Sequence, residues 1–292
     1  MNNLEFIHDY KDINNYRLSF NKLANDTFGV DFEKWYQFGF WNNTYVCYSY
    51  INQNEVVVNV SVSNLDVIID GKEMKALQVG TVMTHPDYRG NGLSKSLMDI
   101  VLKEYEPKCD FIYLFANKNV LDFYPKFGFR KMKQCHFSID VTRKSEHVKA
   151  RKLDITKKGD IEIVRRISQE RIPVSQILGV KNGESILTWY CLNVYNENLY
   201  YLKEDDVIVI YNIEAEVLHL YDIMSKNKIE LNNILGKIIN DEVKKVFFYY
   251  SPDYSDIQVS RVDYDDPNDT LFVKPLLLNI SKDLAYPITA HA

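Results

Sequence analysis

The chain has 292 residues, about twice the usual size of one domain, so it forms either one large domain or two average ones. Apolar residues make up 46% of the chain and charged residues 26%, which excludes a disordered protein. No stretch approaches the ~18 consecutive apolar residues of a membrane span, and the first residues do not form a signal peptide. The four cysteines are isolated from one another, which argues against a zinc site or a disulfide scaffold. We therefore expect a cytoplasmic protein with no membrane partner and no metal.

The net charge of −5 lies in the second half of the chain. Residues 1–150 carry 18 basic and 18 acidic side chains, whereas residues 151–292 carry 17 and 22. A protein that binds duplex nucleic acid normally has a basic excess on one part, so we expect no nucleic acid partner. The acidic second half indicates a solvated surface or, as a weaker alternative, attraction of a cationic small molecule.

The first half predicts alternating strands and helices. Helical spacing and end signals predict helices at residues 13–28, 32–38, 93–107 and 120–127. Runs rich in β-branched and aromatic residues predict strands at residues 4–8, 45–51, 56–62, 66–69, 74–84, 111–116 and 134–141. Asp70-Gly71 is typical of a tight hairpin turn, and Asp31 is the expected N-cap of the second helix.

The second half repeats this order of elements. The pattern predicts helices at residues 160–168, 184–195 and 230–240, and strands at residues 199–202, 207–213, 217–223, 245–250 and 271–273. The polar run at 142–146 is the candidate linker between the halves. We interpret the second half as a diverged structural repeat, although no sequence identity accompanies the shared order.

The most informative segment lies between residues 81 and 98, where a predicted strand passes through a glycine-containing loop directly into a helix. Backbone N–H groups and the helix dipole at such a junction favour a bound phosphate. Gly90 and Gly92 let the backbone approach a ligand closely, and Arg89 adds positive charge. The segment matches neither a P-loop nor a dinucleotide fingerprint. It predicts a pyrophosphate site, although two glycines that only close a turn would give the same pattern.

A second motif follows about 25 residues later, across one helix and one strand. Its residues follow the pattern N-x-x-V-x-x-F-Y-x-x-x-G-F, with the letters standing for Asn117, Val120, Phe123, Tyr124, Gly128 and Phe129. Together with Arg89-x-x-Gly92-x-Ser94 in the loop, this motif resembles the GCN5-related N-acetyltransferase (GNAT) family. That family has Gly or Ala where Ser94 stands and Ala where Val120 stands, and neither change looks disabling. Residues 84–90 resemble the enhanced-intracellular-survival-like subgroup, whose members carry a tandem degenerate second GNAT domain.

The resemblance implies an α/β (α+β) fold class with tandem acyl-CoA N-acyltransferase folds, in which mixed, mostly antiparallel sheets are flanked by helices. Residues 1–145 would be the catalytic GNAT domain and residues 146–292 a degenerate domain without a CoA loop, since residues 224–228 contain no glycine. The second half would shape the acceptor cleft or form a homo-oligomer contact. The subgroup's sterol-carrier-like third domain has no expected counterpart among these residues. Whether this protein shares the subgroup's substrate is therefore left open.

The resemblance also implies an acetyl-CoA-dependent N-acetyltransferase that transfers an acetyl group to a primary amine of a small molecule, such as an aminoglycoside or a polyamine. The amine would attack directly in a ternary complex, with acetyl-CoA as cosubstrate. Two alternatives are a protein amine acetyltransferase and a non-catalytic CoA-binding sensor.

The resemblance assigns roles to individual positions. The strand that ends at Thr84 would splay from its neighbour, pair with the pantetheine arm and offer an N–H group to the oxyanion. The pyrophosphate would lie over the loop. Tyr124 would donate a proton to the leaving thiolate as general acid, and its alternative is a packed core aromatic. The predicted cofactor-binding residues are Val82, Met83, Thr84, Arg89, Gly90, Asn91, Gly92, Leu93, Ser94, Lys95 and Asn117.

The general base and the acceptor pocket are less defined. Glu73 and His85 flank the strand but are the kinds of residue that more often lie on the surface. The resemblance implies that a terminal carboxylate is the general base, and Ala292 could supply it. Our default expectation is instead that a relay of water molecules removes the proton. An aromatic cluster and three acids lie near the expected mouth, where the acids could attract a cationic amine or form a solvated face. These residues are Trp35, Tyr36, Phe38, Phe40 and Trp41, and Asp26, Asp31 and Glu33.

Overall fold

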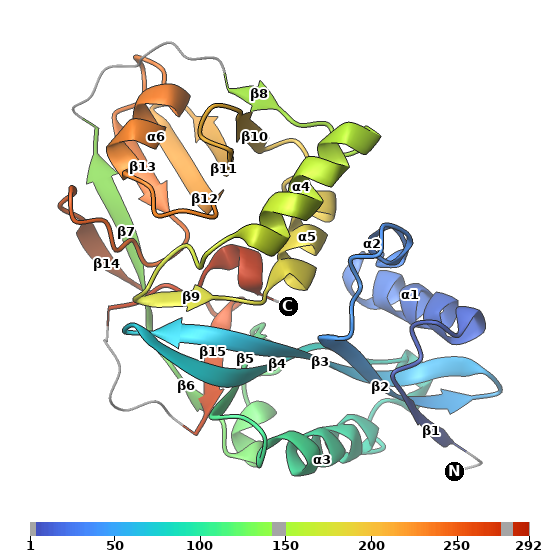
Figure 1. The fold of residues 1–292 in the computed structure, drawn as a ribbon. Helices are drawn as coiled ribbons and strands as arrows, with labels where there is room; N and C mark the ends of the chain where they lie inside the picture. The colour runs from blue at the N-terminus through green and yellow to red at the C-terminus, as the bar shows by residue number, and fades with distance from the viewer. Residues whose placement is uncertain (1–3, 142–149, 276–282, 292) are drawn as a thin grey trace.

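The computed structural model describes residues 4–141, 150–275 and 283–291. These ranges form two mixed sheets and six α-helices, which confirms the predicted fold class (Figure 1). The candidate linker at 142–146, the boundary after residue 145 and Ala292 lie outside the described residues. The 3₁₀ turn Ile288–Ala290, near the end of the described residues, lies between the two sheets (Figure 1).

The first sheet has the strand order β1-β2-β3-β4-β5-β15-β6, and β9 pairs with the far end of β3. β4 and β5 are parallel neighbours, whereas the other pairs are antiparallel. Its strands are β1 (Glu5–His8), β2 (Tyr45–Asn52), β3 (Glu55–Ile69), β4 (Lys72–Thr84), β5 (Phe111–Ala116), β6 (Arg130–Lys131), β9 (Leu178–Val180) and β15 (Thr270–Lys274).

The second sheet has the strand order β14-β7-β13-β12-β11-β10-β8, in which β12 and β13 are the parallel pair. Its strands are β7 (Gln134–Asp140), β8 (Arg151–Lys152), β10 (Leu199–Leu202), β11 (Val207–Glu214), β12 (Val217–Met224), β13 (Lys245–Phe248) and β14 (Ser260–Tyr264).

The helices cover both sheets. In the first half, α1 and α2 pack on one face of the first sheet and α3 packs on the other, so β3 and β4 are buried on both sides. α5 lies between the sheets, because its Ile186 packs with the first sheet and its Leu187 with the second. The helices are α1 (Asn14–Phe28), α2 (Glu33–Gln37), α3 (Leu93–Tyr105), α4 (Lys158–Glu170), α5 (Glu184–Asn193) and α6 (Leu231–Ile238).

The two sheets exchange strands. β7 follows the first half in sequence but pairs with β13 and β14 in the second sheet. β15 belongs to the second half in sequence but lies between β5 and β6 in the first sheet. Figure 1 shows the green β7 in the upper sheet and the red β15 in the lower one. Each half therefore contributes a strand to the other, and the two sheets cannot separate without breaking backbone ladders.

Most predicted elements are present, with a few differences. The two strands predicted at 56–62 and 66–69 are one continuous strand, β3, because residues 58–69 of it pair with β4 across the predicted break. The predicted helix at 120–127 is reduced to a 3₁₀ turn, Tyr124–Phe127. Asp31 accepts a hydrogen bond from the Glu33 N–H at 2.7 Å, but the N-cap residue of α2 is Phe32, so the predicted N-cap is one residue too early. The short strands β6, β8, β9 and β14 were not predicted.

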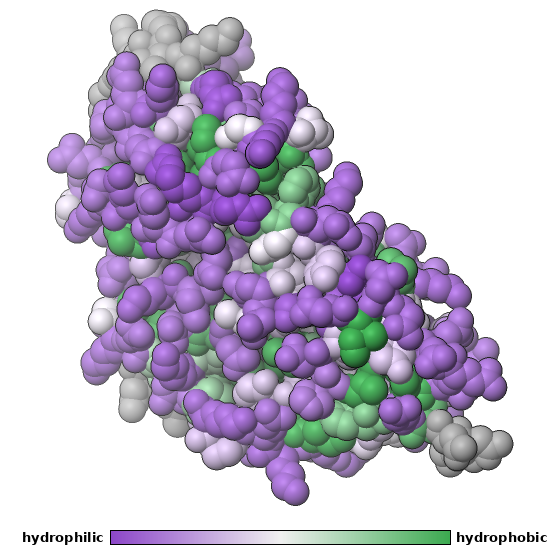
Figure 2. Space-filling view, turned by 45° about the vertical axis from the view of Figure 1, so that its right-hand side comes forward, coloured by the Kyte–Doolittle hydropathy of each residue, from purple (hydrophilic) through white to green (hydrophobic). Residues whose placement is uncertain are grey.

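The face of the molecule in Figure 2 is mostly hydrophilic, and hydrophobic side chains gather mainly on its lower part. No helix in the described ranges is long and apolar enough to cross a membrane.

Candidate functional site

The central feature of the first sheet is a pair of parallel strands that part halfway. β4 and β5 pair only from Ala76↔Phe111 to Gln78↔Tyr113. Beyond Gln78, β4 continues to Thr84 along β3, and β5 continues to Ala116 along β15. The strand that ends at Thr84 therefore splays from its neighbour, as the sequence predicts, and its edge toward β5 is open.

A β-bulge lies in β4 where the strands part. Two residues, Thr81 and Val82, oppose the single residue Val60 of β3, and Thr81 has a φ of 48°. A β-branched residue is rarely found in this left-handed region, so the position is strained. Two hydrogen bonds hold it: the Tyr45 and Thr81 hydroxyls lie 2.8 Å apart, and the Asn59 amide donates to the Thr81 carbonyl at 2.8 Å. The bulge turns the backbone at this point toward the opening.

The glycine loop joins the open strand to α3. Gly90 and Gly92 have φ values of 75° and 72°, and Gly92 is the N-cap residue of α3. A Cβ at either position would meet no protein atom within 4 Å, so a side chain would not clash with the rest of the protein. Glycine is favoured here because of the positive φ. No side chain caps the first turn of α3. Its N–H groups are therefore available to an anion.

One cavity of about 810 Å³ connects these features. Its volume is in the range of small-molecule and cofactor sites. Of the predicted cofactor-binding residues, most line it: Val82, Thr84, Arg89, Gly90, Gly92, Leu93, Ser94, Lys95 and Asn117. Met83 does not line it, because its side chain is buried in the core on the α1 side of the sheet. Asn91 does not line it either, and its amide donates to the carbonyls of Tyr88 and Arg89. The roles predicted for these residues stay predictions.

Tyr124 lies in the wall of the same cavity, at the start of the 3₁₀ turn. Its ring packs against Phe129 and against Phe272 of the exchanged strand β15. Burial raises the pKa of Tyr124 to about 12, so the hydroxyl keeps its proton throughout the neutral range. The position suits a proton donor, and the packing is also compatible with a core aromatic.

Residues from the second half close the other end of the cavity, and the sequence does not single them out. Ile186, Trp189 and Tyr190 of α5 line it, together with His291 near the C-terminus. The sequence leaves two roles open for the second half, shaping the acceptor cleft or forming a homo-oligomer contact. This arrangement agrees with the first. No local signal marks these residues, because their placement depends on how α5 and the C-terminal segment dock between the sheets.

The expected aromatic cluster contributes one residue to the cavity. Trp35 lines it, and its indole N–H donates to the Ser185 carbonyl at 2.8 Å. The other four, Tyr36, Phe38, Phe40 and Trp41, do not line it. The aromatic residues that do line this end include Phe28, Phe32, Tyr45 and Phe115.

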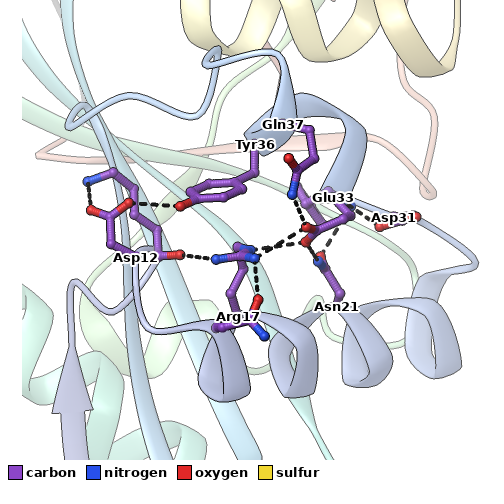
Figure 3. Close-up of polar contacts among 10 residues, drawn as sticks. Asp12, Arg17, Asn21, Asp31, Glu33, Tyr36 and Gln37 are labelled. Carbon is purple, nitrogen blue, oxygen red and sulfur yellow. Dashed lines mark hydrogen bonds and ion pairs between the residues drawn. The ribbon is translucent and has the colours of Figure 1, made fainter.

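The three acids expected near the mouth do not line the cavity either. Glu33 accepts hydrogen bonds from Arg17, Asn21 and Gln37 between α1 and α2 (Figure 3). These partners lower the pKa of Glu33 although its burial alone would raise it. Asp31 accepts a hydrogen bond from the Glu33 N–H at the start of α2, and Asp26 is exposed on α1. The expected attraction of a cationic amine by these acids is therefore wrong, and the solvated face is the better interpretation.

Neither candidate base beside β4 reaches the cavity. Glu73 lies at the hairpin end of the strand and pairs with Lys181 at 2.8 Å. His85 is half-buried but does not line the cavity, and its Nδ1 accepts a hydrogen bond from the Asp87 N–H. In the described part of the chain, no group of three or more His, Cys, Asp and Glu side chains could hold a metal ion.

The splayed strands, the bulge and the uncapped helix start together define an acyltransferase fold of the kind that the resemblance implies. Residues 10–132 match the acetyltransferase (GNAT) domain family. Residues 10–132 therefore carry an acetyltransferase (GNAT) domain. No curated protein matches the sequence significantly.

Solved structures share the fold over both halves of the chain. The chain is similar to a probable N-acyltransferase from Enterococcus faecalis V583, with 16% identity over 93% of this chain and 71% of the other, and a TM-score of 0.59. It is also similar to a GCN5-related N-acetyltransferase from Kribbella flavida, with 15% identity over 93% and 71% and a TM-score of 0.54. Eis1 from Mycobacterium abscessus matches with 14% identity over 92% and 73% and a TM-score of 0.54.

Proposed function

We propose that this protein transfers an acetyl group from acetyl-CoA to a primary amine of a small molecule, by direct attack in a ternary complex. The observation that carries this proposal is a single cavity that reaches from the first turn of α3, past Tyr124, to an aromatic end closed by α5. Such a cavity can hold both substrates at once, which direct transfer requires.

The cofactor would lie along the glycine loop and the open edge of β4. The free N–H groups of the first turn of α3 and the positive charges of Arg89 and Lys95 suit a pyrophosphate. The backbone edge from Val82 to Thr84 suits the amide groups of a pantetheine arm. The acyl carbonyl would then lie near the bulge at Thr81, whose neighbouring N–H groups are candidates to stabilise the oxyanion.

Departure of the thiolate needs a proton donor, and Tyr124 is suited to the task. A thiol releases its proton with a pKa near 8.5 by analogy with cysteine. The Tyr124 hydroxyl has a pKa of about 12, so it is protonated at neutral pH and can donate a hydrogen bond to the sulfur as negative charge develops there. Its proton would move to the sulfur together with the proton that the amide nitrogen returns to the tyrosine.

The lining of the acceptor end favours one class of amine. Among the described residues that line the cavity, Asp122 alone carries a carboxylate, and the acceptor end is formed by aromatic and aliphatic side chains. A polycation such as an aminoglycoside or a polyamine would leave several charges unpaired there, which is costly. We therefore propose an acceptor with one primary amine on an apolar or aromatic body.

Thiol release from acetyl-CoA, measured across a panel of amines, tests this function. The panel contains aromatic and alkyl monoamines, polyamines, an aminoglycoside and a lysine peptide. Monoamines should give the highest kcat/KM, and Tyr124→Phe should lower kcat by ~10²–10⁴-fold. Binding of CoA to Tyr124→Phe, measured by calorimetry, should match the wild type.

Other results would favour the alternatives. Preference for the lysine peptide would indicate a protein acetyltransferase. Wild type and Tyr124→Phe that both bind CoA and both release no thiol would indicate a CoA-binding sensor.

A further inference from the structure

His291 ends the segment that runs between the two sheets, and it lies in the wall of the cavity. The residue is 8% exposed, and its ring stacks on the Phe115 ring with a centroid distance of 3.6 Å and an interplanar angle of 16°. Phe115 belongs to the part of β5 that has separated from β4. The imidazole is therefore held at the edge of the opening where the acceptor would lie.

The two ring nitrogens of His291 have different surroundings. Nδ1 lies 3.6 Å from a carboxylate oxygen of Asp269, in the connection between β14 and β15. Nε2 is buried and has no hydrogen-bond partner among the described residues. A buried polar atom without a partner is unfavourable, so an unmet nitrogen in a cavity wall points to a ligand group that completes it.

Asp269 fixes the state of the ring. Burial alone would raise the pKa of Asp269, but the adjacent imidazole lowers it overall, so the carboxyl group is ionised. An ionised carboxylate beside Nδ1 favours the tautomer with its proton on Nδ1, which leaves a lone pair on Nε2.

The other groups packed around the ring carry no charge at neutral pH. They are Phe115, Tyr286 and Tyr190, and burial followed by the charge of Asp269 raises the pKa of Tyr190 further above its usual value. Asp269 is therefore the charged group that faces the imidazole in the described residues.

We propose that Nε2 of His291 is the general base that takes the proton from the acceptor amine, and that Asp269 is the positioning residue that orients the imidazole. This role rests on the proposed acetyl transfer and replaces the water relay expected from the sequence. It also gives the unmet nitrogen a partner, because an ammonium group donates a hydrogen bond to Nε2 before it loses its proton.

Protons and bonds balance over the whole transfer. The ammonium gives one proton to Nε2, and the neutral amine forms the C–N bond to the acyl carbon. The C–S bond then breaks and Tyr124 gives its proton to the sulfur. The second proton lost by the nitrogen on amide formation restores the tyrosine hydroxyl, and His291 releases its proton to solvent. The products are the amide, CoA thiol and one proton.

The test compares acceptors that differ in their need for a base. One is a primary alkylamine, which is protonated at neutral pH, and the other is an aromatic amine of similar size, which is already neutral. His291→Gln should lower kcat/KM for the alkylamine by ~10²–10⁴-fold at pH 7 and change the value for the aromatic amine by less than about tenfold. The alkylamine rate of the variant should rise about tenfold per pH unit toward the acceptor's own pKa of roughly 10, by analogy with lysine. The wild-type rate should rise less steeply.

Controls separate this role from folding and from the function itself. His136→Gln removes an imidazole that also stacks on an aromatic ring, Tyr264, but lies outside the cavity, and it should change neither rate. CoA affinity should match the wild type in every variant. If His291→Gln does not fold, Asp269→Asn decides the question, since it should lower kcat for the alkylamine, leave KM unchanged and steepen the pH profile.

Equal losses with both acceptors, or an alkylamine rate that His291→Gln leaves unchanged, would overturn the assignment of the base and leave the proposed function intact. A wild-type protein that acetylates no amine would instead overturn the proposed function.

Discussion

Each sheet contains one pair of parallel strands that separate partway along their length and leave an opening between them. The two openings differ in what lies in them. In the first sheet β4 and β5 separate after Gln78, and the opening is part of the cavity. In the second sheet β12 and β13 pair only as far as Leu220↔Phe248, although β12 continues to Met224. The protein fills this second opening with its own chain.

The C-terminal segment occupies the second opening. The Ile288 N–H donates to the Tyr249 carbonyl at 3.0 Å, directly after β13, the strand that corresponds to β5 in the first sheet. The Thr289 hydroxyl donates to Asp222, which is also paired with Arg171 at 2.8 Å. Both side chains of this ion pair are nearly inaccessible to solvent, with exposures of 1% for Asp222 and 9% for Arg171.

The helices that follow the two openings also differ. α3 begins at Gly92 with no side chain on its first turn, whereas the first turn of α6 donates from the Asn232 N–H to the carboxylate of Asp256. A carboxylate of the protein thus occupies the position that an anion would take. In the second sheet, the C-terminal segment therefore occupies the opening between the strands, and the Asp256 carboxylate occupies the start of the following helix. The described residues leave both positions open in the first sheet.

The largest effect should come from breaking the closure of the second opening. Asp222→Ala leaves the Arg171 guanidinium buried without its partner and should lower the free energy of unfolding by about 3–5 kcal/mol in urea denaturation. Glu73→Ala is the control, because its ion pair with Lys181 is exposed on both sides and should contribute about 1 kcal/mol or less. Equal losses from the two variants would mean that the second opening is not held closed by this pair.

A smaller effect should follow from a substitution in the glycine loop beside the first opening. Gly92→Ala places a Cβ where we propose that the pyrophosphate lies, and it should weaken CoA binding about tenfold, or ~1.4 kcal/mol. Gly71→Ala is its control, since Gly71 in the β3–β4 hairpin has a similar φ of 74° and an equally empty surrounding. Both variants should lose similar stability, and only Gly92→Ala should lose affinity. A similar loss of affinity in both would contradict the placement of the pyrophosphate at this loop.

The smallest effect concerns one buried tyrosine from each half. Burial raises the pKa of Tyr124 and of Tyr249 to about 12, from a usual value near 10. The folded protein holds these two protons more tightly, so the contribution of the two tyrosines to the free energy of unfolding should be constant below about pH 10 and fall between about pH 10 and 12. Tyr124→Phe should reduce the slope of this fall slightly, measured by urea denaturation at several alkaline pH values. A stability that rises above pH 10 would contradict the burial of both hydroxyl groups.

The sequence predicts local structure well where a pattern is complete within a segment. It predicts β5 with the bounds that the structure shows, since six apolar residues are followed directly by a loop. It also predicts the start of α3 and the hairpin at Asp70-Gly71, because glycine marks the required backbone conformation. The break predicted between residues 62 and 66 is wrong, because Ser63 and Asn64 look polar but lie in a strand that β4 pairs throughout.

Features that depend on long-range docking could not be predicted. The residues of β7 and β15 suit a strand in either sheet, so the strand exchange has no local signal. The bulge at Thr81 contains no glycine to mark it, and its strain is held by Tyr45 and Asn59 from other strands. His291 reaches the cavity only because the C-terminal segment fills the second opening first.

Calorimetric titration of the full-length protein with CoA tests the central claim most directly, because the two openings differ in whether the chain has already filled them. We expect one site per chain, and a Gly92→Ala protein that loses affinity at that one site. Two equivalent sites, or no heat of binding at all, would contradict the claim.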